Sequence, residues 1–238
     1  MKRAIAAVLM VVIITSGLLV GCGGVLTGSG NLKTEEYAFS DFNKVEVSSA
    51  FEFEISQSSS YSISVIADDN VIEKVQVSKL GDTLRIGLGA ITRLGPVTLK
   101  ATVTMPQLRG LDISGASRGT VSDFSSAENL DLNVSGASKV TGEITSGDAN
   151  FEISGASTVQ LEGSANNMVA NVSGASRFNL GGFIVNNANV TFSGASTGTA
   201  NLNGRLDADL SGASKLSYIG EPIMGNINTS GASAINKK

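Results

Sequence analysis

The sequence has no histidine and a single cysteine, Cys22. Without histidine, the usual base of a serine hydrolase is missing, so the Gly-x-Ser-x-Gly matches at 115–119 and 194–198 do not predict a nucleophile elbow. One cysteine cannot form a disulfide framework, so stability has to come from packing. The net charge of −4 disfavours general nucleic-acid binding.

The second half contains a repeat, the tetrapeptide Ser-Gly-Ala-Ser, which recurs every 18 to 21 residues. Its copies begin at Ser114, Ser135, Ser154, Ser173, Ser193, Ser211 and Ser230. A period of this length corresponds to one turn of a solenoid and is too short for paired helices. The repeat therefore predicts a parallel β-helix with seven regular rungs.

The residues before each tetrapeptide alternate between apolar and polar, the pattern of a strand with one buried face. The third residue before it is apolar in every copy: Leu111, Leu132, Phe151, Ala170, Val190, Ala208 and Ile227. The glycine of each copy suits a tight corner that needs a positive φ or a close backbone approach. We therefore expect identical columns of side chains along the rod.

The N-terminus has the pattern of an export signal. Lys2 and Arg3 precede an apolar run over 4–20, which ends just before Cys22 and resembles a bacterial lipoprotein signal with its lipobox. The run is short for a membrane span, although a plain transmembrane anchor is the alternative. The resemblance implies removal of 1–21, lipidation of Cys22 and permanent attachment to a membrane outside the cytoplasm.

Cleavage there takes away two basic residues and no acidic one, so the formal charge changes from −4 to −6. The glycine-rich start of the mature chain favours a flexible tether over 22–36. A single domain is expected over 37–238, with irregular strands in 37–110 and the repeats in 111–238. The early strands are interpreted as less regular rungs and a cap, because 47–51 reads as a degenerate copy of the repeat.

Together, the lipoprotein signal, the alternating strands and the Ser-Gly-Ala-Ser rungs resemble the autotransporter adhesin head (GIN domain) family of bacterial envelope proteins. The resemblance covers about residues 39–238. It implies an all-β fold, a right-handed parallel β-helix, with a role in adhesion. It supplies no functional residues, and Ser49 departs from the repeat where the other corners have glycine.

A basic column is the candidate binding site. The residue after the tetrapeptide is a cation in four copies, Arg118, Lys139, Arg177 and Lys215, which we call the basic stripe. Such a stripe suits an anionic glycan, a phosphate-bearing envelope polymer or a surface protein. Alternatively, it pairs with the acidic columns or keeps the surface soluble. It lacks interleaved aromatic residues, which weakens a sugar-stacking or nucleic-acid interpretation.

Acidic residues in the outward columns leave an enzymatic alternative open. Asp112, Asp131, Glu152, Asp207 and Asp209 provide carboxylates of the kind that polysaccharide lyases and hydrolases use, or a weak calcium site, without forming an obvious acid pair. The expected function is non-enzymatic: a lipid-anchored binding scaffold or adhesin of the cell envelope, without cofactor or metal. The alternatives are a polysaccharide-active enzyme and a purely structural or stress-linked envelope protein.

Overall fold

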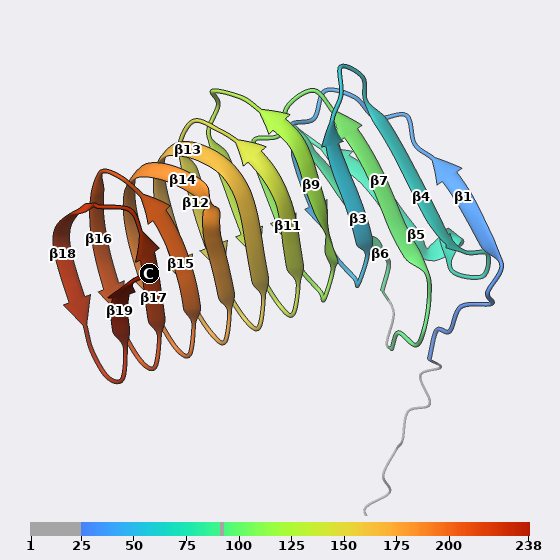
Figure 1. Cartoon of the computed structure of the whole chain (residues 1–238). Helices are drawn as coiled ribbons and strands as arrows, with labels where there is room; N and C mark the ends of the chain where they lie inside the picture. The colour runs from blue at the N-terminus through green and yellow to red at the C-terminus, as the bar shows by residue number, and fades with distance from the viewer. Residues whose placement is uncertain (1–24, 91–92) are drawn as a thin grey trace, which may run out of the picture.

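The computed structural model describes residues 25–90 and 93–238, which form an all-β solenoid of parallel strands stacked side by side (Figure 1). All of its strands belong to one 19-stranded sheet that winds around the core. The sequence prediction of a β-helix is confirmed. Each Ser-Gly-Ala-Ser copy is a corner between two strands, so the coil has a pre-corner face and a post-corner face.

The pre-corner face follows the stacking axis. In spatial order it contains β5 (Val75–Leu80), β6 (Thr83–Leu88), β2 (Lys44–Val47), β8 (Gly110–Ile113), β10 (Leu130–Val134), β12 (Ala149–Ile153), the ends of β13 (Thr158–Val172) and β14 (Arg177–Phe192), β16 (Arg205–Leu210) and β18 (Ile223–Thr229). All of these neighbours are parallel except β5, which is antiparallel to β6.

The post-corner face has the same organisation. In spatial order it contains β1 (Leu32–Glu36), β4 (Ser62–Asp68), β7 (Leu99–Met105), β3 (Glu52–Gln57), β9 (Arg118–Ser125), β11 (Lys139–Thr145), the starts of β13 and β14, β15 (Thr197–Leu202), β17 (Lys215–Ile219) and β19 (Ala234–Lys237). Here β1 and β4 are the antiparallel members. A short 3-10 helix, η1 (Ile72–Lys74), lies between β4 and β5.

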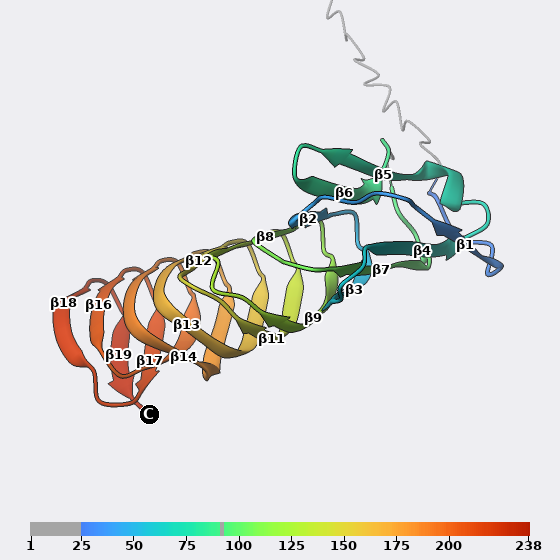
Figure 2. The same ribbon diagram turned by 90° about the horizontal axis from the view of Figure 1, so that it is seen from above.

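The N-terminal strands enter the stack out of sequence order. Strand β2 pairs with β6 on one side and with β8 on the other, so 47–51 forms a corner one rung before the first exact repeat. Ser49 and Ala50 both have positive φ there, 67° and 63°. Seen from above, β1, β4, β5 and β6 lie at one end of the rod (Figure 2). The antiparallel strands at this end cover the first rungs, the capping role predicted for this half.

The core consists of the columns expected from the repeat. In the column before each corner, Leu132, Phe151 and Val190 are fully buried. A second inward column follows each corner and is also buried, as at Val140, Val159, Phe178 and Leu216. Phenylalanine rings of neighbouring rungs pack edge to face: the Phe151 and Phe178 centroids lie 5.2 Å apart, and those of Phe178 and Phe192 lie 6.3 Å apart. Apolar burial along identical columns therefore holds the rungs together.

The structure differs from the expected tether over most of 22–36. Leu26 forms a parallel bridge with Leu94, and its N–H donates to the Arg93 carbonyl at 3.0 Å. Residues 32–36 are strand β1, paired with β4. Glycine content alone suggested flexibility, whereas long-range backbone hydrogen bonds fix this segment against the body.

Candidate functional site

The corners determine which side chains face solvent. From the second exact copy onward, the glycine alone adopts a positive φ, for example 71° at Gly194. The N–H of the following alanine donates to the glycine carbonyl one rung earlier, as from Ala195 to Gly174 at 2.8 Å and from Ala213 to Gly194 at 2.7 Å. The backbone ladder thus continues through the corner and holds successive rungs in register.

The last serine of each tetrapeptide points inward. Ser117, Ser157 and Ser196 are 0% exposed. The Ser196 hydroxyl donates to the Ser193 carbonyl at 2.7 Å, which closes the corner. Ser117 and Ser196 belong to the two Gly-x-Ser-x-Gly matches, and their burial leaves neither hydroxyl open to a substrate. These serines are part of the scaffold.

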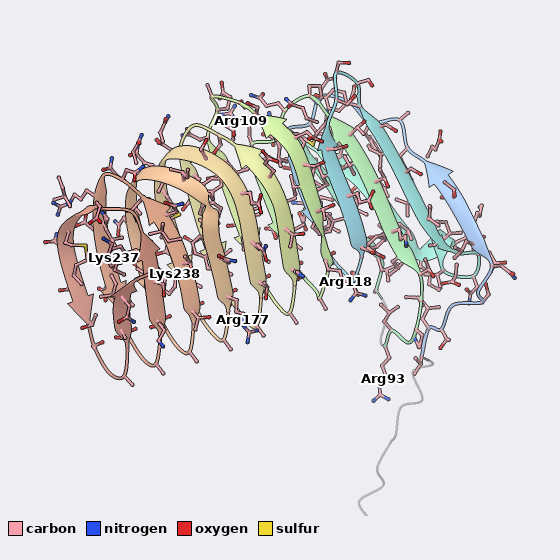
Figure 3. The ribbon with its side chains drawn as sticks, in the orientation of Figure 1. Arg93, Arg109, Arg118, Arg177, Lys237 and Lys238 are labelled. Atoms are coloured by element: carbon pink, nitrogen blue, oxygen red, sulfur yellow. The ribbon has the colours of Figure 1, made fainter. Side chains whose placement is uncertain are left out.

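The basic stripe is a true column on the post-corner face. Strand pairing places Lys139 directly beside Arg118. Thr158 then separates Lys139 from Arg177, and Thr197 separates Arg177 from Lys215. All of the stripe's cations are exposed. Figure 3 shows Arg118 and Arg177 along the lower edge of the body, where the corners lie, whereas Arg109 lies on the opposite edge. The structure therefore brings the predicted residues into one line.

Within 25–90 and 93–238, the stripe's four cations form no ion pair. Their charges are consequently available to an external anion. A shallow hollow of about 230 Å³ lies between Arg177 and Lys215, with Asn179 and Thr199 among its lining residues. Its polar groups could donate hydrogen bonds to the oxygens of a bound anion.

The column continues into the N-terminal rungs, which sequence reasoning missed. Glu52 pairs in register with Arg118 on one side and with Lys100 on the other. Lys100 Nζ lies 3.6 Å from Glu52 Oε2, so this end of the column is internally compensated. No local pattern could have revealed this, because β3 and β9 are brought together from distant parts of the chain.

Along the repeats, the main outward column of the pre-corner face consists of acids, amides and a threonine, and at its N-terminal end Arg85 Nε lies 2.9 Å from Glu46 Oε2. This column is Glu46, Asp112, Asn133, Glu152, Asn171, Thr191, Asp209 and Asn228. The side chains form ladders between rungs, as where Asn171 Nδ2 donates to Glu152 Oε1 at 2.6 Å. A groove of about 290 Å³ runs along this column beside the first serines of the corners. Desolvation, and secondarily the nearby charge of Glu46, raise the pKa of Asp112 above its ordinary value.

Among the acids that suggested an enzyme, Asp207 is engaged by groups of the protein itself. Arg205 Nε lies 2.7 Å from Asp207 Oδ2, and this hydrogen bond, together with one from the Asn226 N–H, lowers the pKa of Asp207. Asp207 is therefore held ionised by an internal partner. In the described part of the chain, no group of three or more histidine, cysteine, aspartate or glutamate side chains is placed to hold a metal ion.

Cys22 and the apolar run over 4–20 lie outside the described residues. Within residues 25–90 and 93–238, no helix is long and apolar enough to cross a membrane. The lipidation of Cys22 stays a prediction.

These features define a class: a parallel β-solenoid whose flat faces carry continuous side-chain columns. A family model described as "Putative auto-transporter adhesin, head GIN domain" matches residues 41–222. The chain belongs to this family. Membership suggests an exported, surface or envelope protein, and the family is described by adhesion, not by an enzymatic activity.

Solved structures share the fold. A protein described as a "putative adhesin" from Bacteroides fragilis NCTC 9343 has 22% identity and a TM-score of 0.84, covering 90% of this chain and 100% of its own. A "putative lipid binding protein" from Parabacteroides distasonis ATCC 8503 has 20% identity and a TM-score of 0.73, with coverage of 90% and 100%. A "putative adhesin" from Parabacteroides merdae ATCC 43184 has 17% identity and a TM-score of 0.67, with coverage of 90% and 98%. No curated protein matches the chain.

Proposed function

We propose that this protein is a non-catalytic binding scaffold of the bacterial envelope, lipid-anchored through Cys22, which uses its basic stripe to bind anionic partners. The anchoring membrane is the outer face of the plasma membrane, or the outer membrane in a cell that has one. The partner on the stripe is an anionic glycan, an envelope polymer or an acidic surface protein. Nucleic acid is disfavoured, because the mature chain has a formal net charge of −6.

The carrying observation is the alignment of Arg118, Lys139, Arg177 and Lys215 in one exposed column, where none of them forms an ion pair with another residue of 25–90 or 93–238. Parallel strands lie about 4.8 Å apart, so directly adjacent Arg118 and Lys139 repel each other, and an external polyanion relieves this repulsion. Family membership and the adhesin descriptions of the relatives support a binding role. The description of one relative as lipid binding agrees with a membrane-associated protein.

The test is binding of the mature chain, residues 22–238, to immobilised heparin and to polyphosphate. We expect binding that weakens as salt rises and falls at least about tenfold when Arg118, Lys139, Arg177 and Lys215 are all changed to Gln, since each lost contact weakens an electrostatic complex. The matched control changes Arg109, Arg205, Lys237 and Lys238 to Gln, which alters net charge equally away from the stripe. Equal binding by the stripe variant and the wild type, or no binding to either polyanion, contradicts the proposal.

A further inference from the structure

The first described residues are fixed to the body by a buried carboxylate. Asp68 is 2% exposed, and its oxygens accept hydrogen bonds from the N–H groups of Gly30 and Thr98, each at 2.7 Å. The Gly28 N–H donates to the Pro96 carbonyl at 2.9 Å. This clamp joins the N-terminal segment to the loop before β7. The path from Cys22 to the body is therefore much shorter than a tether over 22–36.

Three residue steps separate Cys22 from Val25, where the described structure begins. Even fully extended, they span only about 10 Å. That distance is close to the screening length of physiological salt, about 8 Å. If Cys22 carries lipid, the part of the body next to Val25 is thus held where the charge of the membrane surface is felt.

This attachment point and the basic stripe share one edge of the body. Leu26 is hydrogen-bonded to Arg93, and Figure 3 shows Arg93, Arg118 and Arg177 along the same lower edge. The stripe extends away from the attachment point along the stacking axis. A body held by this end can therefore bring the whole stripe to the membrane by lying down.

We propose that the basic stripe rests on the anionic phosphate headgroups of the membrane that holds Cys22, so that the solenoid lies along the membrane. This inference rests on the proposed lipidation and names the partner of the stripe. Association with an anionic surface strengthens about fivefold for each Lys or Arg brought near it, which is about 1 kcal/mol per cation. Short attachment removes most of the cost of bringing the stripe to that surface.

The acidic column of the pre-corner face determines how the solenoid is rotated about its stacking axis relative to the membrane. Asp112, Glu152 and Asp209 lie on the other side of the same corners, on the pre-corner face. If the corner edge pointed straight at the membrane, the cations of the stripe and the acids of the pre-corner face would lie equally close to the lipid. The solenoid therefore tilts toward its post-corner face only as far as the stripe, because exposed Glu143 and Glu162 lie further along that face. The acid- and amide-lined groove of the pre-corner face then points away from the membrane.

The test couples Cys22, the only thiol, to a maleimide lipid in a supported bilayer and measures the thickness of the protein layer by neutron reflectometry. Standing upright, the strands of the pre-corner face alone span about 40 Å at about 4.8 Å per step. On a bilayer with anionic phosphatidylglycerol at low salt, we expect a layer clearly thinner than that. On purely phosphatidylcholine bilayers, or in high salt, we expect the layer to thicken.

Two variants separate this orientation from a general charge effect. Changing Arg118, Lys139, Arg177 and Lys215 to Gln should thicken the layer on the anionic bilayer, whereas the control set Arg109, Arg205, Lys237 and Lys238 to Gln should leave it thin. Equal thickness on both bilayers, or no response to the stripe variant, overturns the proposal.

Failure of the inference can be told from failure of the proposed function. If the stripe variant loses heparin and polyphosphate binding in solution but its layer is unchanged, a free polyanion is the partner and the orientation is wrong. Mass spectrometry of the protein from cells tests lipidation separately, because acylation adds a defined mass at Cys22. An unmodified Cys22 refutes the anchor and overturns the orientation with it.

Discussion

The two halves of the solenoid reach the same cross-section by different routes. From β8 onward, the chain stacks each rung on the one before it in sequence, with a corner at every Ser-Gly-Ala-Ser. Before β8, the spatial order is β6, β2, β8, and antiparallel strands close the end. Local repetition therefore builds the regular half, and long-range pairing builds the other.

Their corners differ in the same way. Ser49 and Ala50 of the corner at 47–51 both adopt positive φ, and so do Gly115 and Ala116 of the first exact copy, whereas the corners from the second exact copy onward use it at glycine alone. From Gly136 to Ala232, the corner backbones form a ladder, which a side chain on the glycine would obstruct. The irregular corner at 47–51 contacts a repeat corner on one side only, whereas a regular corner within the stack has to fit the backbone of a repeat corner on both sides.

The largest expected effect is in the regular core. Phe178→Ala removes a ring that packs against Phe151 and Phe192, and should lower the free energy of unfolding by about 3–5 kcal/mol. Urea titration followed by circular dichroism measures this loss. Phe178→Leu is the control and should cost less, since it leaves a smaller cavity. A loss below about 1 kcal/mol for the alanine variant would show that the edge-to-face packing of these phenylalanines does not hold the rungs together.

A substitution at a regular corner should come next. Gly194→Ala forces a side chain into φ 71° and puts its Cβ 2.5 Å from the Gly174 carbonyl oxygen. We expect a loss of about 2 kcal/mol or more in the same titration, since the left-handed conformation alone costs about 1–2 kcal/mol.

Gly181→Ala is the matched control, because its Cβ would meet nothing closer than Asn179 Oδ1 at 3.4 Å. If both alanine variants were equally stable, close stacking of the corners would be refuted.

The irregular corner should respond in the opposite direction. Ser49→Gly introduces the residue that the repeat has at this position. Glycine removes the backbone strain of a serine at φ 67°, in the left-handed region. Thermal unfolding should show a gain of about 0.5–1 kcal/mol. A loss of stability would mean that the Ser49 side chain contributes more than its backbone strain costs.

The smallest effect is a local dependence on pH at Asp68. Hydrogen bonds from the Thr98 and Gly30 N–H groups hold the pKa of Asp68 below its ordinary value. The ionised clamp therefore stabilises the folded state above the unfolded pKa, and this contribution is lost as pH falls through the lowered folded pKa. Hydrogen exchange should show faster exchange at 26–30 below about pH 4, after correction for the intrinsic rate. The Asp68→Asn variant should show this faster exchange of residues 26–30 already at pH 7. Unchanged protection of these residues in the variant would refute the clamp.

Sequence reasoning succeeded where structure is local. The repeat predicted the corners, the inward columns of Leu132 and Val140, and the alignment of Arg118 with Lys139. It could not predict that Lys100 and Glu52 extend that column, because only the pairing of β3 with β7 and β9 places them there. It also assigned flexibility to 22–36, since nothing near Gly28 or Gly30 in sequence shows that Asp68 and Pro96 bind them.

Both halves form one stack, so the columns run continuously from the N-terminal rungs to the repeat rungs. Hydrogen exchange of the native mature chain, resolved by peptide, tests this continuity directly. We predict that β3 (Glu52–Gln57) and β7 (Leu99–Met105) are protected as strongly as β9 (Arg118–Ser125). Exchange of β2, β3, β6 and β7 as a separate, faster unit while β9 stays protected would contradict it.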